Sequence, residues 1–76
     1  MSEINHDYLH SWGLAELRFG DNGFLWFSDE NQGWIVESYR KPVGIIAWSD
    51  FDSAVIKGEP EDWLTEQAEK IIDACR

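Results

Sequence analysis

Basic side chains are scarce in this sequence of 76 residues. Six lysines and arginines stand against fifteen aspartates and glutamates, which gives a formal net charge of −9. This balance excludes a protein that binds nucleic acid through a basic surface, because phosphate binding needs clustered Lys and Arg. The single cysteine, Cys75, excludes an intrachain disulfide and a metal site built from several cysteines. No run of about 20 apolar residues occurs, so we expect no membrane-spanning helix.

Signatures of catalysis are absent as well. The sequence has no Gly-x-Ser-x-Gly motif, no glycine-rich phosphate loop and no calcium-binding loop. His6 and His10 are four residues apart, a spacing that can hold a metal ion on one helical face, but no third ligand follows from it. We interpret them as solvent-exposed histidines, and we expect a protein that is not an enzyme and binds no metal ion or other cofactor.

The composition that is present indicates one folded domain over residues 1–76. Hydrophobic residues make up 43% of the chain and aromatic residues 14%, including five Trp, whereas disordered chains lack such residues. The acidic stretch 1–7 does not resemble a secretory signal peptide, which begins with basic residues and continues with apolar ones. We therefore expect a cytoplasmic protein, and its negative charge disfavours anionic membrane surfaces.

Two hydrophobic periods follow one another along the chain. A period of two, interrupted by turn residues such as those at 20–23, predicts four strands at 14–19, 24–27, 34–39 and 43–48. A helical period predicts a short helix within 2–12, a second helix over 49–57 and a third from Pro60 to the C-terminus. The expected fold class is α+β. It is a four-stranded antiparallel meander packed against the C-terminal helix, with a short N-terminal helix, in the order α-β-β-β-β-α-α and in two layers.

The negative charge is concentrated in two parts of the chain. Residues 1–38 carry seven acids and one base, and residues 59–76 carry six acids and two bases, whereas the segment between them has three bases and two acids. In the C-terminal helix, acids at intervals of three or four residues form one line opposite the apolar stripe: Asp62, Glu66, Glu69 and Asp73. Such a line is typical of a solvated helix face. Mixed charges would stabilise the helix better, however, so we also interpret it as a binding surface.

Two tryptophans and one loop complete the candidate partner-binding residues. Trp26 and Trp48 alternate with apolar residues of their strands, so a sheet with an uncovered face would expose some of these rings. Exposed Trp is a frequent anchor of protein interfaces. Alternatively, helices cover both faces, or the rings pack against one another. Asp29 and Glu30 lie in the polar loop before the third strand and add negative charge.

Two short motifs resemble a known group of proteins. The segment Lys41-Pro42-Val43-Gly44 is followed by Asp50-Phe51-Asp52-Ser53, which would open a helix after a β-meander. This arrangement is similar to one in small anti-CRISPR proteins that target type I-F surveillance complexes. The chain as a whole resembles the small acidic inhibitors encoded by phages and mobile elements. The resemblance implies a protein without chemistry of its own that blocks the nucleic-acid path or a moving part of its target.

Charge, surface and resemblance together predict a non-enzymatic acidic inhibitor. It would bind a basic, nucleic-acid-binding surface of a protein target as a nucleic-acid mimic, without contacting nucleic acid itself. The partner would be a nucleic-acid-handling enzyme or complex. Two alternatives stay open: a toxin-neutralising or adaptor-type interaction domain, and a small homodimeric accessory protein.

Overall fold

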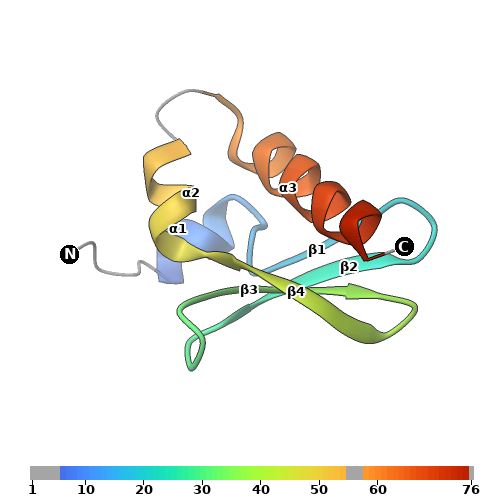
Figure 1. Cartoon of the computed structure of the whole chain (residues 1–76). Helices are drawn as coiled ribbons and strands as arrows, with labels where there is room; N and C mark the ends of the chain where they lie inside the picture. The colour runs from blue at the N-terminus through green and yellow to red at the C-terminus, as the bar shows by residue number, and fades with distance from the viewer. Residues whose placement is uncertain (1–5, 55–57, 76) are drawn as a thin grey trace.

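Strands form where apolar residues alternate, and short turns connect them. The computed structural model describes residues 6–54 and 58–75, which include a four-stranded antiparallel sheet in the order β1-β2-β3-β4. The strands are β1 (Glu16–Phe19), β2 (Gly23–Ser28), β3 (Gly33–Ser38) and β4 (Lys41–Ala47), and the helices are α1 (His6–Ser11), α2 (Trp48–Ala54) and α3 (Pro60–Ala74). This arrangement confirms the expected α+β meander with a short N-terminal helix and a C-terminal helix packed against the sheet (Figure 1).

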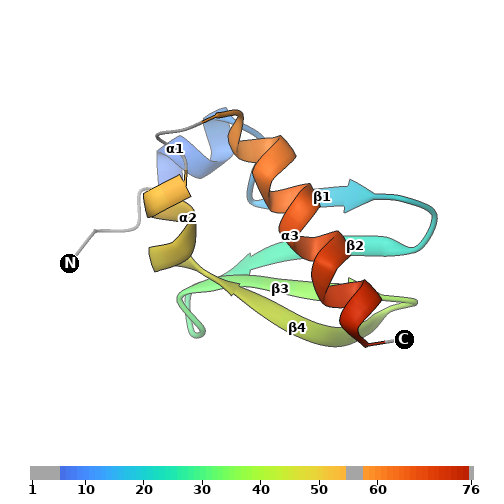
Figure 2. The ribbon, with the colours of Figure 1, turned by 45° about the horizontal axis from the view of Figure 1, so that its top comes forward.

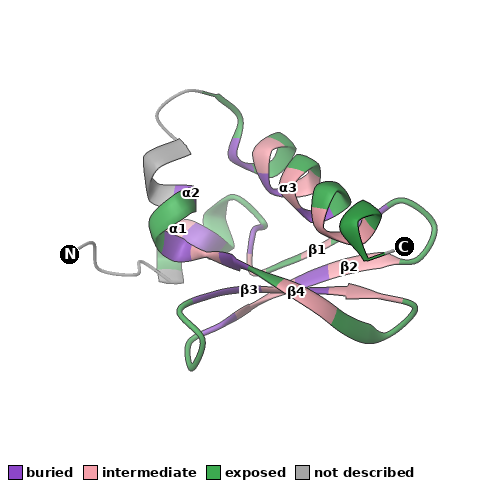
Figure 3. Cartoon of the chain, in the orientation of Figure 1, coloured by how far each residue is buried: buried purple, intermediate pink, exposed green. Residues whose placement is uncertain are grey.

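The helices lie on one side of the sheet, which gives the domain two layers (Figures 1 and 2). Successive side chains of a strand point to opposite faces, so every second residue faces the helices. Several of those that do are buried, among them Leu25, Trp34, Val36 and Ile46. On the opposite face, Ile45 is 46% exposed, and Figure 3 shows the change from buried to exposed residues along β4.

The position of α3 over the sheet depends on small and apolar residues. Pro60 begins the helix, where its missing N–H would have had no partner within the helix. Leu64 and Ala68 are fully buried. At Gly44 of β4 a Cβ atom would lie 2.5 Å from Cγ2 of Ile71, so the absence of a side chain there allows the close approach of α3.

The boundaries differ from the sequence prediction near β4. The sequence predicts Trp48 as the last residue of a strand, but β4 ends one residue earlier and Trp48 begins α2. The turn before β4 consists of Tyr39 and Arg40, both with positive φ, and the strand starts directly after them. The predicted helical residues 2–5 and 55–57 lie outside the described residues.

An aromatic cluster forms the centre of the core. Trp34 is fully buried, stacks on Trp48 with ring centroids 5.6 Å apart, and packs against Phe51 at 4.7 Å. Phe27 makes edge contacts with both tryptophans. Nε1 of Trp34 donates a hydrogen bond of 2.7 Å to the carbonyl oxygen of Leu14, which ties the segment before β1 to β3. Mutual packing of rings, one of the alternatives left open by the sequence, thus accounts for Trp34 and Trp48, and Trp63 also makes an edge contact with Phe51 of this cluster.

Candidate functional site

The four acids predicted to form a line on the C-terminal helix are all exposed on α3: Asp62, Glu66, Glu69 and Asp73. Glu66 pairs with Lys70 at 3.4 Å between Oε1 and Nζ, and the two side chains are 65% and 66% exposed. An exposed pair at this spacing contributes about 0.5 kcal/mol or less. The line therefore remains predominantly negative, and it faces away from the sheet.

The turn that carries Asp29 and Glu30 does not join this line. It connects β2 to β3 at the end of the sheet opposite to the C-terminal half of α3 (Figure 1). Both residues are exposed. The structure thus separates two groups of acids that sequence reasoning combined in one binding surface.

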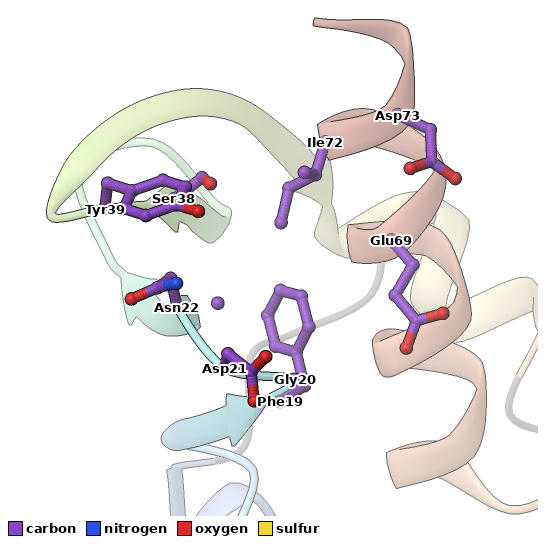
Figure 4. A pocket seen from close by; sticks show the side chains of 10 residues that line it. Phe19, Gly20, Asp21, Asn22, Ser38, Tyr39, Glu69, Ile72 and Asp73 are labelled. Atoms are coloured by element: carbon purple, nitrogen blue, oxygen red, sulfur yellow. The ribbon is translucent and has the colours of Figure 1, made fainter. Parts of the chain in front are cut away.

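A hollow of about 280 Å³ lies between the C-terminal half of α3 and the turns before β2 and β4. Phe19 and Ile72 point into it from β1 and α3 and form an apolar floor (Figure 4). The charged residues that line it are all acidic: Asp21, Glu69 and Asp73. We call this site the acidic hollow. Two of the predicted helix acids therefore border a concave site.

Tyr39 stands at the rim of the acidic hollow in a strained turn. Tyr39 and Arg40 connect β3 to β4 with φ values of 53° and 65°, a conformation that favours Gly or Asn. The N–H of Tyr39 donates a 3.1 Å hydrogen bond to the carbonyl oxygen of Asn22, which joins the two turns that form the hollow. Tyr39 is 72% exposed. Backbone strain of this kind is frequent at functional sites.

Sequence reasoning missed Asp21 and Tyr39 as members of this site. The hollow is built from three segments, at 19–23, 38–39 and 69–73, which only the antiparallel pairing and the placement of α3 bring together. The turn signal at 20–23 identifies a hairpin, but nothing in it indicates that the hairpin ends beside a helix.

The two tryptophans predicted as partner anchors lie in different environments. Trp26 is on the sheet face away from the helices, and its Nε1 donates a 2.7 Å hydrogen bond to Oε2 of Glu37. Trp48 is only 7% exposed, so it is buried in the core and is not a surface anchor. Trp48 is buried because β4 ends one residue before it. The N–H of Trp48 bonds to the carbonyl oxygen of Gln32 at 2.9 Å, and the chain turns into α2 with the ring stacked on Trp34.

Within residues 6–54 and 58–75, no group of three or more His, Cys, Asp or Glu side chains could hold a metal ion. His10 is exposed, whereas the side chain of His6 lies outside what the structure describes. No helix in the same ranges has the length and apolar character needed to cross a membrane.

Comparisons with protein-family models, with curated proteins and with solved structures give no match. A functional hypothesis therefore depends on two surfaces of the molecule itself. One is the acidic hollow with the exposed side of α3, and the other is the uncovered face of the sheet.

Proposed function

We propose that the chain is a non-enzymatic inhibitor that binds a basic surface of a protein target through the acidic hollow and the exposed side of α3. The supporting observation is that the acidic hollow combines an apolar floor, made by Phe19 and Ile72 (Figure 4), with three acidic residues in its lining, Asp21, Glu69 and Asp73. A line of carboxylates on its own fits a solvated helix face. A concave apolar floor beside it offers a side chain of the partner a place to be buried.

A lysine or arginine side chain of the target suits the acidic hollow. Such a side chain buries its aliphatic stem against apolar groups and keeps its charged head beside carboxylates. Asp21 comes from the β1–β2 turn, and Glu69 and Asp73 come from α3, so acids border the hollow from two elements. Tyr39 adds an exposed aromatic ring at the rim, and tyrosine is a frequent anchor of protein interfaces.

The other acids of α3 extend the contact beyond the hollow. Asp62 and Glu66 continue the line along the helix, with a rise of roughly 4.5–6 Å between successive acids. Proteins that bind nucleic acid present Lys and Arg along the path of the phosphates. We therefore propose nucleic-acid-handling proteins as the targets, with α3 occupying the path of the nucleic acid. A net charge of −9 accelerates the encounter with such a path and makes it salt-sensitive.

Affinity capture with matched charge reversals tests this proposal. The immobilised proteins are the wild type, the Glu69→Lys/Asp73→Lys variant and a Glu30→Lys/Asp50→Lys control, each exposed to a lysate of the source cells. All four acids are exposed, and both variants change the net charge equally. We expect the α3 variant to bind the captured target about tenfold more weakly, equivalent to about 1.4 kcal/mol. The control should bind like the wild type.

A short DNA duplex added to the captured material separates the candidate functions. An inhibitor that occupies a nucleic-acid path is displaced by DNA, and its binding weakens between about 50 and 200 mM salt. A toxin-neutralising or adaptor domain keeps its partner when DNA is added. Capture that persists both after the α3 charge reversal and in the presence of DNA contradicts the inhibitor proposal.

A further inference from the structure

The sheet face opposite the helices, here called the open sheet face, has no described element packed on it (Figures 1 and 3). Its central residues form two rows that run across all four strands. The first row is Glu16, Trp26, Ile35 and Ile45, and the second is Arg18, Phe24, Glu37 and Pro42. Five of these eight side chains are apolar, so the face exposes a band of apolar surface between charged residues of β1 and the outer strand β4.

The two rows are complementary to each other. On β1 an acid of the first row stands beside a base of the second, and on β2 and β4 each row carries an apolar residue. Consider a two-fold axis that lies in the plane of the face, runs perpendicular to the strands and passes between the two rows. This axis would place the first row of one molecule opposite the second row of the other molecule. The resulting pairs are Glu16 with Arg18, Trp26 with Phe24, and Ile45 with Pro42.

We propose that the open sheet face binds a second copy of this chain about such an axis. The two β1 strands then form two symmetric ion pairs, and the aromatic and aliphatic pairs form the centre of an isologous interface. On β3, Ile35 meets Glu37 of the second copy. This acid already accepts a hydrogen bond from Nε1 of Trp26 at 2.7 Å, so it enters the interface with a partner.

The charge of the open sheet face permits this association although the chain is acidic. Glu16 and Glu37 are balanced by Arg18 and by Arg40 of the adjoining turn. Arg18 lies over the ring of Phe24, with its guanidinium carbon 5.8 Å from the ring centroid. The acids of α3 lie on the other side of the sheet, on a helix about 10 Å across, and the Debye length at physiological ionic strength is about 8 Å. Repulsion between two copies is therefore weak at this face.

The small size of the face limits the strength of the dimer. Four strands about 4.8 Å apart and four to seven residues long cover at most roughly 19 by 24 Å. Stable complexes bury about 800 Å² on each partner, which is more than this footprint. We therefore expect a concentration-dependent dimer with a Kd in the micromolar range.

Sedimentation velocity with charge-swapped variants tests the proposal. The measurements are made under reducing conditions, because Cys75 is exposed. We expect the average mass of the wild type to rise from 8.8 kDa toward twice that value as concentration increases. Glu16→Arg and Arg18→Glu each place like charges opposite one another, and each should weaken the dimer about tenfold. The double variant restores opposite charges and should recover most of the affinity.

Ile45→Lys provides an independent test, because the side chain is 46% exposed and its replacement leaves the core intact. We expect a folded monomer, with an unchanged far-ultraviolet circular dichroism spectrum. A wild type that stays monomeric up to about 1 mM overturns the proposal, and a double charge swap no tighter than the single variants overturns the two-row pairing. A different protein that binds the wild type but not Ile45→Lys, while the pure chain is monomeric, assigns the face to that protein instead. These outcomes are independent of target capture, since α3 lies on the other side of the sheet.

Discussion

Replacing Trp34 or Trp48 by phenylalanine tests what stabilises the aromatic core. The two rings are stacked neighbours and are 0% and 7% exposed. They differ at the indole nitrogen. Nε1 of Trp34 donates a 2.7 Å hydrogen bond to the carbonyl oxygen of Leu14, whereas Nε1 of Trp48 is buried without a hydrogen-bond partner in the described part of the chain. We expect Trp34→Phe to destabilise the fold strongly and Trp48→Phe much less.

The size of the difference follows from these hydrogen bonds. Each substitution removes the same indole atoms and leaves a similar gap, at a cost of about 1–2 kcal/mol. Trp34→Phe also leaves the Leu14 carbonyl oxygen without its donor, which costs about 1–3 kcal/mol more. Trp48→Phe removes an N–H that the core leaves unpaired, and this offsets its loss of packing by a similar amount. The two variants should therefore differ by about 2 kcal/mol or more in the free energy of unfolding.

Urea denaturation followed by far-ultraviolet circular dichroism measures this difference without relying on the fluorescence of the rings that are changed. With a slope of about 1 kcal/mol per molar urea for a small domain, the two midpoints should lie about 2 M apart. Equal midpoints would show that the Trp34–Leu14 hydrogen bond contributes no net stability. A lower midpoint for Trp48→Phe than for Trp34→Phe would mean that ring packing at Trp48 outweighs both hydrogen-bond effects.

Two further changes test the backbone near β4. Gly44→Ala places a methyl group against Ile71, whose χ1 is restricted in a helix, so we expect a loss of about 1–2 kcal/mol in the urea assay. Combined with Ile71→Ala, its cost should be less than the sum of the two single costs, and strict additivity would contradict the contact. Tyr39→Asn/Arg40→Gly supplies residues that tolerate positive φ, and we expect a gain of about 1 kcal/mol. The same variant should capture less target. Unchanged capture would remove Tyr39 from the site.

The fold follows from local sequence patterns because the residues of each strand, turn and helix favour the conformation of that element. Alternating apolar residues, the turn at 20–23 and Pro60 at the start of α3 specify the strands, a hairpin and a helix without reference to distant contacts. The prediction is wrong where a local preference competes with contacts between residues distant in the sequence. Trp48 continues the apolar run of β4, so its sequence neighbourhood favours a strand. The stacking of its ring on Trp34 and the bond of its N–H to Gln32 place it in α2.

The candidate site is less predictable because it depends on the placement of α3 across the sheet. Exposure of Glu69 and Asp73 follows from the helical period alone. Their position beside Asp21 and Tyr39 depends on where the helix approaches β4 closely, and one glycine, Gly44, permits that approach. No spacing in the sequence connects these segments. The alternation of residues along each strand predicts which side chains lie on the open sheet face. Their alignment into two complementary rows depends on the register between strands, including the register shift beside Glu37.

The two proposals together have a geometric consequence. A dimer built on the open sheet face has its sheets in the middle and its α3 helices outside, so the two acidic hollows face away from each other. One target surface cannot contact both hollows, and dimerisation therefore brings no gain in avidity toward a single site. It instead joins two target molecules. Light scattering of purified complexes should show two targets bridged by the wild-type dimer and one target for each chain of Ile45→Lys, with equal affinity per site. Tighter binding of one target by the dimer would contradict this outward arrangement of the hollows.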